Sequence, residues 1–106
     1  LLGKEYPQFE VVWFGHIGDG NLHINILKPD AMSQADFVAD CERVTKLLAQ
    51  VLEAHAGSIS AEHGIGLVKK PYLGCTRSAA EIAVMRGIKA VLDPNGIMNP
   101  GKVFDL

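Results

Sequence analysis

The chain has 106 residues, of which 48% are apolar and 21% charged, values that fit one modest globular domain. Its formal net charge of −2 gives no electrostatic basis for binding nucleic acid or an anionic membrane. No apolar run approaches the roughly 18–20 residues of a membrane span, so we expect no transmembrane segment. The first residues carry neither an initiator Met nor a signal-peptide pattern, which indicates a piece of a longer chain.

A β-hairpin is predicted at about residues 10–28. Residues 11–14 are β-branched or aromatic, which favours a strand. Residues 22–26 alternate between apolar and polar side chains, as a strand with two different faces does. Between them, the run Gly-Asp-Gly-Asn at 18–21 is typical of a turn, because glycine adopts positive φ without strain.

An amphipathic helix is predicted from Ser33 to about Ala56. Ser33 is suited to cap its N-terminus, with Asp36 three residues on in an arrangement similar to a capping box. Apolar side chains then recur at steps of four and three, at Phe37, Cys41, Val44, Leu48 and Val51. Gly57 is suited to end the helix. On this apolar stripe Cys41 is expected to be a buried, reduced thiol, which indicates a reducing and therefore cytoplasmic setting.

A second helix is predicted from Ser78 to Leu92. Ser78 and Glu81 have the spacing of a capping box, and Pro94 ends the helix because proline disfavours helical conformation in the residue before it. Residues 58–61 are expected to be short and extended, and residues 62–66 are too rich in glycine for regular structure. The whole pattern predicts an α+β fold, with helices packed on one face of an antiparallel sheet in a single domain at 1–106.

Two histidines flank the predicted turn of the hairpin. An even-length turn centred on residues 19 and 20 would place His16 opposite His23, with Cβ atoms about 4.5–5.5 Å apart. Asn25 follows His23 by two residues and therefore shares its face. The register thus predicts a polar face of His16, His23 and Asn25, on which both imidazoles could reach one metal ion. A one-residue bulge would remove this pairing.

A metal site on this face also needs a carboxylate. Asp19 is a candidate, although the turn alone accounts for it. Glu62 is the stronger candidate, because two histidines and a glutamate with an open fourth position form a known catalytic zinc pattern. Glu62 and its neighbour His63 would point in opposite directions in a regular strand, so a shared site requires irregular backbone, which Gly64 permits. A solvated loop carboxylate is the alternative for Glu62.

Three strings occur in order along the chain: Gly-His-Ile-Gly-Asp-Gly-Asn-Leu-His at 15–23, Ser-Ala-Glu-His-Gly-Ile-Gly at 60–66 and Asn-Pro-Gly-Lys at 99–102. Together they closely resemble the C-terminal domain of FAD-linked oxidases of the vanillyl-alcohol oxidase type. Within that group they look like the branch of the D-lactate, D-2-hydroxyglutarate and glycolate dehydrogenases. The resemblance implies a C-terminal fragment of an FAD-dependent dehydrogenase that oxidises a 2-hydroxy acid to the 2-keto acid. It also implies that FAD is bound mainly by a domain N-terminal to this chain.

The resemblance further implies roles for individual residues. His16, His23 and Glu62 match the divalent-metal ligands of the family, usually for zinc. His63 matches the proposed general base, and Asn25 matches a position that contacts the substrate. Asn99 lies in the terminal string that approaches the flavin in relatives.

Two other functions fit the same residues. A metal-dependent hydrolase would use the same ligands to activate water. A non-catalytic α+β module that binds a ligand or forms a homo-oligomer would use the face that otherwise meets the flavin domain. Bound flavin in the full-length protein distinguishes the dehydrogenase from the hydrolase.

Overall fold

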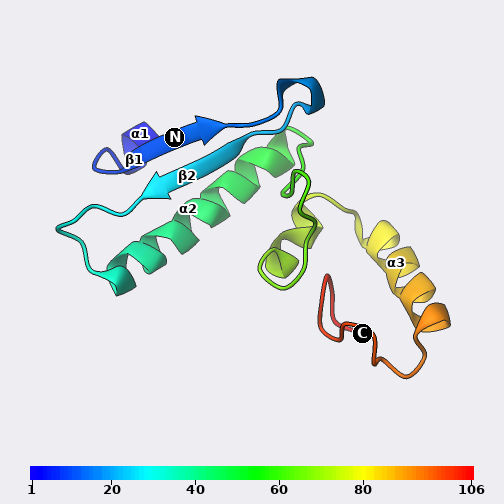
Figure 1. Cartoon of the computed structure of the whole chain (residues 1–106). Helices are drawn as coiled ribbons and strands as arrows, with labels where there is room; N and C mark the ends of the chain where they lie inside the picture. The colour runs from blue at the N-terminus through cyan, green and yellow to red at the C-terminus, as the bar shows by residue number, and fades with distance from the viewer. The chain divides into compact units, whose positions relative to one another are not determined.

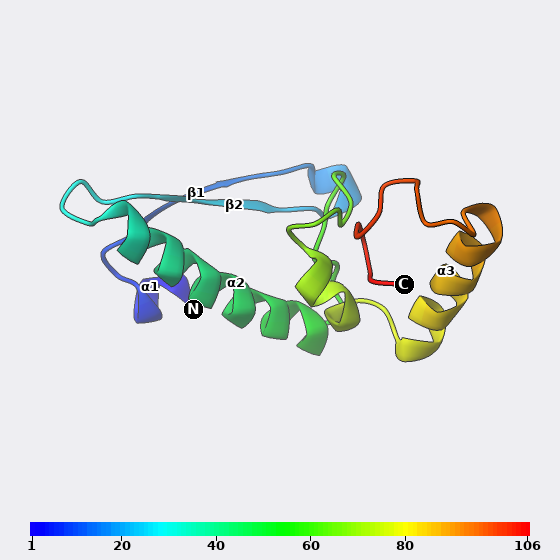
Figure 2. The same cartoon turned by 90° about the horizontal axis from the view of Figure 1, so that it is seen from below.

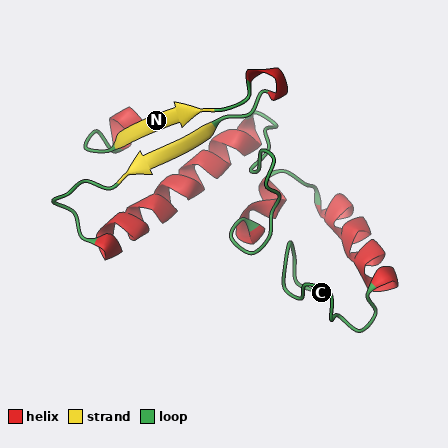
Figure 3. Cartoon of the chain, viewed as in Figure 1, coloured by secondary structure: helices red, strands yellow, loops and turns green.

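The computed structural model describes all 106 residues. In chain order the elements are α1 (Leu2–Glu5), β1 (Glu10–Phe14), η1 (Ile17–Asp19), β2 (His23–Leu27), α2 (Gln34–Ala54), η2 (Lys70–Cys75) and α3 (Ala79–Leu92), where η marks a short 3₁₀ helix (Figure 1). The chain combines a two-stranded antiparallel sheet with helices, which confirms the predicted α+β class; Figure 3 colours these strands and helices. None of the helices combines the length and hydropathy needed to cross a membrane.

The chain divides into two compact units, Leu1–Leu48 and Ala49–Leu106. The first contains the hairpin and most of α2, and the second contains the end of α2, η2, α3 and the C-terminal segment. Each unit is described by itself below.

The hairpin of the first unit is confirmed, but its expected register is wrong by two residues. β1 and β2 pair antiparallel, with Phe14 opposite His23 and Val12 opposite Asn25. His16 therefore lies beyond the end of β1 and does not face His23. The reason is the connection, which is longer than a two-residue turn and contains η1.

Asn21 closes this connection. The backbone N–H of His16 donates to the side-chain oxygen of Asn21 at 2.8 Å, and the Asn21 N–H donates to the His16 carbonyl at 3.3 Å. A side-chain amide thus takes a place that a ladder bond would otherwise hold. Gly15 allows the two segments this close, because a Cβ there would lie 2.2 Å from the Asn21 carbonyl oxygen. A hydrophobicity pattern does not reveal such a connection.

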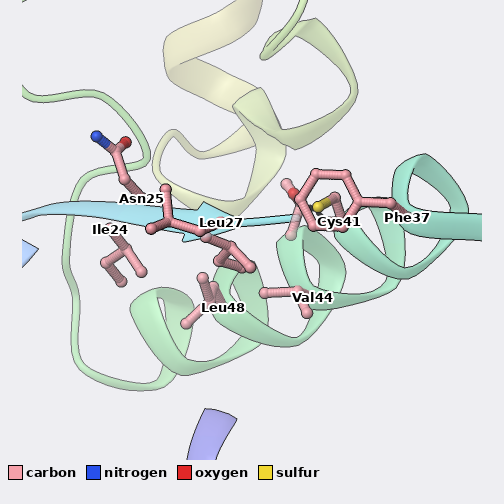
Figure 4. Close-up of a pocket in the computed structure, with 9 residues that line it drawn as sticks. Ile24, Asn25, Leu27, Phe37, Cys41, Val44 and Leu48 are labelled. Carbon is pink, nitrogen blue, oxygen red and sulfur yellow. Dashed lines mark hydrogen bonds between the residues drawn. The ribbon is translucent and has the colours of Figure 1, made fainter. Parts of the chain in front are cut away.

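The two faces of β2 differ as expected. Ile24 and Ile26 are half-buried, whereas Asn25 is exposed. Ile24 and Ile26 face α2 across an apolar cavity of about 400 Å³ that Val44 and Leu48 also line. In Figure 4 the Asn25 side chain points away from α2. The view in Figure 2 shows α2 running along one face of the hairpin. His23 and Asn25 therefore share the face opposite α2, as predicted.

Helix α2 begins where the sequence indicates. The Ser33 hydroxyl accepts from the Asp36 N–H at 3.1 Å and donates to its carboxylate at 2.7 Å. Along the predicted stripe Val44 is fully buried, and Cys41 is half-buried as a free thiol. Burial, and then the neighbouring Asp40 carboxylate, raise the pKa of the Cys41 thiol, which keeps it protonated. Val51, also on the predicted stripe, is 42% exposed.

The end of α2 uses a different residue from the one expected. The left-handed conformation belongs to Ala56, with φ of 53°, and not to Gly57. The Gly57 N–H donates to the Leu52 carbonyl at 2.7 Å and the Ala56 N–H to the Glu53 carbonyl at 3.2 Å, which together form a Schellman motif. A Cβ at residue 57 would lie 2.9 Å from a methyl carbon of Leu52, so the Leu52 side chain would have to shift.

In the second unit, helix α3 begins with the predicted capping box. The Ser78 N–H donates to the Glu81 carboxylate at 2.7 Å, and the Glu81 N–H donates to the Ser78 hydroxyl at 3.2 Å. The bond that the Glu81 carboxylate accepts from the Ser78 N–H is the main reason that the pKa of Glu81 is lowered. Residues 58–61 were expected to be extended, but they bend at Ile59 and join no sheet. The Ser60 N–H instead donates to the Ser58 hydroxyl at 3.3 Å.

Candidate functional site

The outer face of the hairpin carries His23 and Asn25. Their alternation along β2 places both on the face away from α2. The His23 ring stacks on the ring of Phe14, its partner across the hairpin, with centroids 4.9 Å apart and planes 5° apart. Because the stack orients the imidazole, His23 presents a ring of defined direction.

His16 lies in the connection rather than in a strand. Its backbone is extended, with φ of −108° and ψ of 102°, and its side chain is exposed. Continuing the observed register pairs residue 16 with residue 21, so His16 is a diagonal neighbour of His23. Diagonal neighbours across an antiparallel pair are roughly 7–8 Å apart, whereas the Cβ atoms of directly opposed residues are about 4.5–5.5 Å apart. His16 and His23 are therefore farther apart than the directly opposed pair that the sequence predicts.

Glu62 and His63 lie on an irregular loop of the second unit. The backbone bends at residues 61–63, and the two side chains approach to 3.7 Å between His63 Nε2 and Glu62 Oε1. The side chains are 73% exposed for His63 and 47% for Glu62. The irregular backbone that a shared site requires is thus present. Consecutive residues place a carboxylate beside an exposed imidazole.

Ser60 and Lys69 close this loop, which we call the 60–64 loop. The Ser60 hydroxyl donates to the Gly64 carbonyl at 2.8 Å and accepts from the Lys69 ammonium at 3.2 Å. Gly64 has φ of 80°, a conformation open to glycine at little cost. The loop that carries Glu62 and His63 is thus tied across its base by side-chain hydrogen bonds.

The C-terminal segment at 99–105 is bonded to the residues that follow this loop. The Val103 N–H donates to the Gly66 carbonyl at 2.8 Å. The Lys70 ammonium donates to the Gly101 carbonyl at 3.0 Å and to the Asp105 carboxylate at 2.6 Å. In Figure 1 the C-terminal segment, in red, runs beside the turn of η2. Two of the three strings singled out in the sequence therefore meet in one unit. The roles of Lys69 and Lys70 had no sequence signal beyond their position after the second string.

Asn99 is held in a strained loop. Its φ is 47°, which an L-residue adopts rarely. The loop before it is fixed by Asp93, which is 4% exposed and accepts from the N–H groups of Ile97 and Met98 at 3.0 and 2.9 Å. The Lys89 ammonium donates to the same carboxylate at 2.5 Å and also to the Met98 carbonyl. The Lys89 hydrogen bond is the main cause of a lowered pKa for Asp93.

The residues expected to hold a metal are divided between the two units. Within each unit, no group of three His, Cys, Asp or Glu side chains lies together as metal ligands would. His16 and His23 belong to the first unit, and Glu62 belongs to the second. In chemical type, two imidazoles and one carboxylate suit a first-row divalent ion such as zinc. Asp19 is part of η1, as the simple turn interpretation of that residue implies.

Comparison with known proteins identifies the same family that the three strings resemble. Residues 1–103 match the family described as FAD linked oxidases, C-terminal domain. A D-2-hydroxyglutarate dehydrogenase from Xanthomonas citri pv. viticola is 74% identical over 105 residues, covering 99% of this chain and 22% of that protein. A protein of the same name from Stutzerimonas stutzeri is 59% identical over 104 residues, covering 98% of this chain and 22% of that protein.

A more distant relative has a different name. A putative mitochondrial D-lactate dehydrogenase from Schizosaccharomyces pombe is 49% identical over 102 residues, covering 92% of this chain and 18% of that protein. The chain thus spans about a fifth of the length of the relatives it matches.

Proposed function

Because the chain belongs to the family of FAD linked oxidases, C-terminal domain, we propose that it is the substrate- and metal-binding part of an FAD-dependent 2-hydroxyacid dehydrogenase. The whole protein oxidises a 2-hydroxy acid to the 2-keto acid and passes the hydride to FAD. The observation that carries this proposal is the 74% identity, over 99% of the chain, to a D-2-hydroxyglutarate dehydrogenase.

Among 2-hydroxy acids we propose D-2-hydroxyglutarate as the preferred substrate. Two bacterial relatives that cover nearly the whole chain carry that name, whereas the D-lactate dehydrogenase relative is less similar. D-lactate and glycolate, which we also considered from the sequence, then become the comparison substrates. None of the relatives described above is named for the oxidation of glycolate.

The chain's own residues then have distinct tasks. His63 accepts the proton of the substrate hydroxyl, because a neutral imidazole is a competent base near neutral pH and this one is accessible. Glu62, beside it, stabilises the positive charge that the imidazole gains. Asn25, exposed on the outer face of β2, donates to or accepts from a polar group of the substrate. The electrons leave as a hydride from Cα of the substrate, which becomes the keto carbon.

Two bound groups complete the chemistry. A divalent metal, zinc by the type of its ligands, would be held by His16, His23 and Glu62, and it supplies a Lewis acid that makes the substrate hydroxyl more acidic. FAD supplies the acceptor for the hydride.

The segment near Asn99 suits the neighbourhood of a flat, apolar ring. Ile97 and Met98 precede Asn99 and are 77% and 57% exposed. Asn99 adds an amide that can both donate and accept. We propose that this segment lies against the flavin, most of which is bound by a separate FAD-binding domain of the same protein.

The partner of this chain is proposed to be that FAD-binding domain. Four large apolar side chains of α3 are more than half exposed, at Val84, Ile88, Val91 and Leu92. Apolar side chains gathered on one helix commonly mark an interface. A second copy of this chain is the alternative partner for these side chains. A cytoplasmic location, expected from the reduced thiol, remains part of the proposal.

Steady-state kinetics of the full-length protein test this function. Initial rates are measured with an artificial electron acceptor for D-2-hydroxyglutarate, D-lactate and glycolate. We expect bound flavin, and kcat/KM roughly tenfold or more higher for D-2-hydroxyglutarate, because the other two acids lack its second carboxylate. A flavin-free protein that hydrolyses esters or amides would instead support the metal-dependent hydrolase.

A further inference from the structure

We propose that Lys69 and Lys70 are positioning residues that hold the 60–64 loop and the C-terminal segment at 99–105 in fixed register. The inference rests on the proposed function, since it gives the two lysines the task of placing His63 and Asn99. Lys69 and Lys70 are not expected to touch the substrate themselves.

The two lysines contact different segments: Lys69 contacts the 60–64 loop, and Lys70 contacts the C-terminal segment. Lys69 donates to Ser60, which in turn donates to Gly64, so its ammonium braces the loop around His63. Lys70 donates to the carbonyl of Gly101, 31 residues away. Because the two lysines are consecutive, a shift of one loop is transmitted to the other through a single peptide unit.

Burial indicates that these ammonium groups have a structural task. Both lysines are half-buried, and the side chain of Lys70 is 24% exposed. A lysine usually keeps its charged end in water, and an ammonium taken partly out of water needs acceptors in its place. The Ser60 hydroxyl fills that need for Lys69, and the Gly101 carbonyl fills it for Lys70.

Backbone strain supports the same conclusion independently. Val103 has φ of 68°, which is unfavourable for a β-branched residue, and Asn99 has φ of 47°. Such conformations persist only where the surrounding contacts determine them. The bond to Gly66 is made by the N–H of the strained residue Val103 itself, and Lys70 holds the carbonyl of Gly101, two residues before it. The C-terminal segment is thus held in a conformation that it would not adopt alone.

The chain offers matched controls for Lys70. Asp105 is 80% exposed, so its ion pair with Lys70 contributes little, and Asp105→Asn leaves the bond to Gly101 available. Lys46 is an exposed lysine of α2, and Lys46→Met reports the effect of losing one positive charge. We therefore expect Lys70→Met to lower kcat, and Asp105→Asn and Lys46→Met to leave it near the wild-type value.

The experiment measures kcat and KM for D-2-hydroxyglutarate, with flavin content and the thermal midpoint, in the full-length protein. Lys69→Met and Lys70→Met should each lower kcat about 10–10²-fold, because a displacement near 1 Å at a reacting group costs that much. KM, flavin content and the thermal midpoint should change little, and Lys69→Arg should recover most of the rate. Ser60→Ala removes the acceptor of Lys69 and should reproduce its effect even if Lys69→Met does not fold.

A double-mutant cycle separates positioning from general stability. If Lys69 acts through His63, then Lys69→Met should lower kcat no further in a His63→Asn background. Additive effects, or rates of Lys69→Met and Ser60→Ala equal to that of Lys46→Met, would overturn the inference while leaving the proposed function intact. An unchanged rate in His63→Asn alone would overturn the assignment of the base, and the inference with it.

Discussion

At the scale of single residues, the pair Glu62 and His63 carries most of the proposed chemistry. The bend at residues 61–63 brings consecutive side chains to within 3.7 Å of each other, which a regular strand would not do. The same bend leaves the His63 side chain mostly exposed, where a substrate can reach it. An imidazole and a carboxylate are thus brought together by local backbone geometry rather than by distant parts of the chain.

Replacing His63 tests its role as the base. In the full-length protein, His63→Asn should lower kcat roughly 10²–10⁴-fold while metal and FAD contents stay near normal. Its residual rate should rise with pH, as hydroxide replaces the missing base. Kinetics and metal analysis on the same preparation check both expectations. Loss of the metal would identify His63 as a ligand, and an unchanged kcat would remove it from the mechanism.

Features that depend on residues close together in the chain are the ones best predicted from the sequence. The shared face of His23 and Asn25 follows from the alternation of a strand, and the structure has it. The need for irregular backbone at Glu62 and His63 follows from their adjacency. The end of α2 is less predictable. The sequence does not say which of the neighbours Ala56 and Gly57 adopts the left-handed conformation, and in the structure it is Ala56.

At the scale of elements, the hairpin connection decides where His16 lies. The reciprocal bonds between His16 and Asn21 depend on the close approach that Gly15 allows. A short turn was the simplest expectation from the run at 18–21, and it put His16 opposite His23. Helix ends were predicted correctly at Ser33 and Ser78, because a cap is a contact between residues three apart. The register of the hairpin was predicted wrongly, because it depends on the hydrogen bond from the His16 N–H to the Asn21 side chain in the connection.

Gly15 gives a direct test of this connection. Gly15→Ala would place a Cβ 2.2 Å from the Asn21 carbonyl oxygen, so the backbone must separate. We expect a loss of stability of about 1–3 kcal/mol, measured as a lower thermal midpoint, with a lower metal content because His16 moves. Gly18→Ala is the matched control, since a Cβ there meets nothing within 4 Å. Equal midpoints for the two variants would argue against the close approach.

The Asp93 carboxylate makes the loop before Asn99 sensitive to acid. Hydrogen bonds, first from Lys89 and then from the backbone of Met98 and Ile97, lower the pKa of Asp93 below its usual 3.8. A depressed folded pKa means that the stabilisation is complete above the unfolded pKa and is lost as pH falls through the folded value.

The expected consequence is a difference between variants at low pH. The thermal midpoint of the wild-type protein should fall more steeply below about pH 4 than that of Asp93→Asn, which carries no titrating group. Asp30→Asn, at an exposed position, should keep the wild-type slope. Parallel curves for all three proteins would show that the Lys89–Asp93 contact does not contribute to acid sensitivity.

At the scale of the whole molecule, the chain is organised as two units, with His16, His23 and Asn25 in the first and Glu62, His63 and Asn99 in the second. The links from Lys70 to Gly101 and from Gly66 to Val103 join residues more than 30 positions apart. Composition and periodicity contain no signal for such contacts, so the sequence indicates the strings but not these hydrogen bonds. The exposed apolar side chains of α3 are the surface on which we propose that the FAD-binding domain packs.

The most direct test of the central claim is anaerobic reduction of the flavin in the full-length protein. D-2-hydroxyglutarate is added in the absence of oxygen and of any other acceptor, and the visible absorbance of the flavin is followed. We expect the absorbance of oxidised flavin to disappear, with one 2-oxoglutarate formed for each flavin reduced, and we expect His63→Asn to slow this reduction. A flavin that stays oxidised with D-2-hydroxyglutarate, D-lactate and glycolate alike would contradict the assignment of a 2-hydroxyacid dehydrogenase.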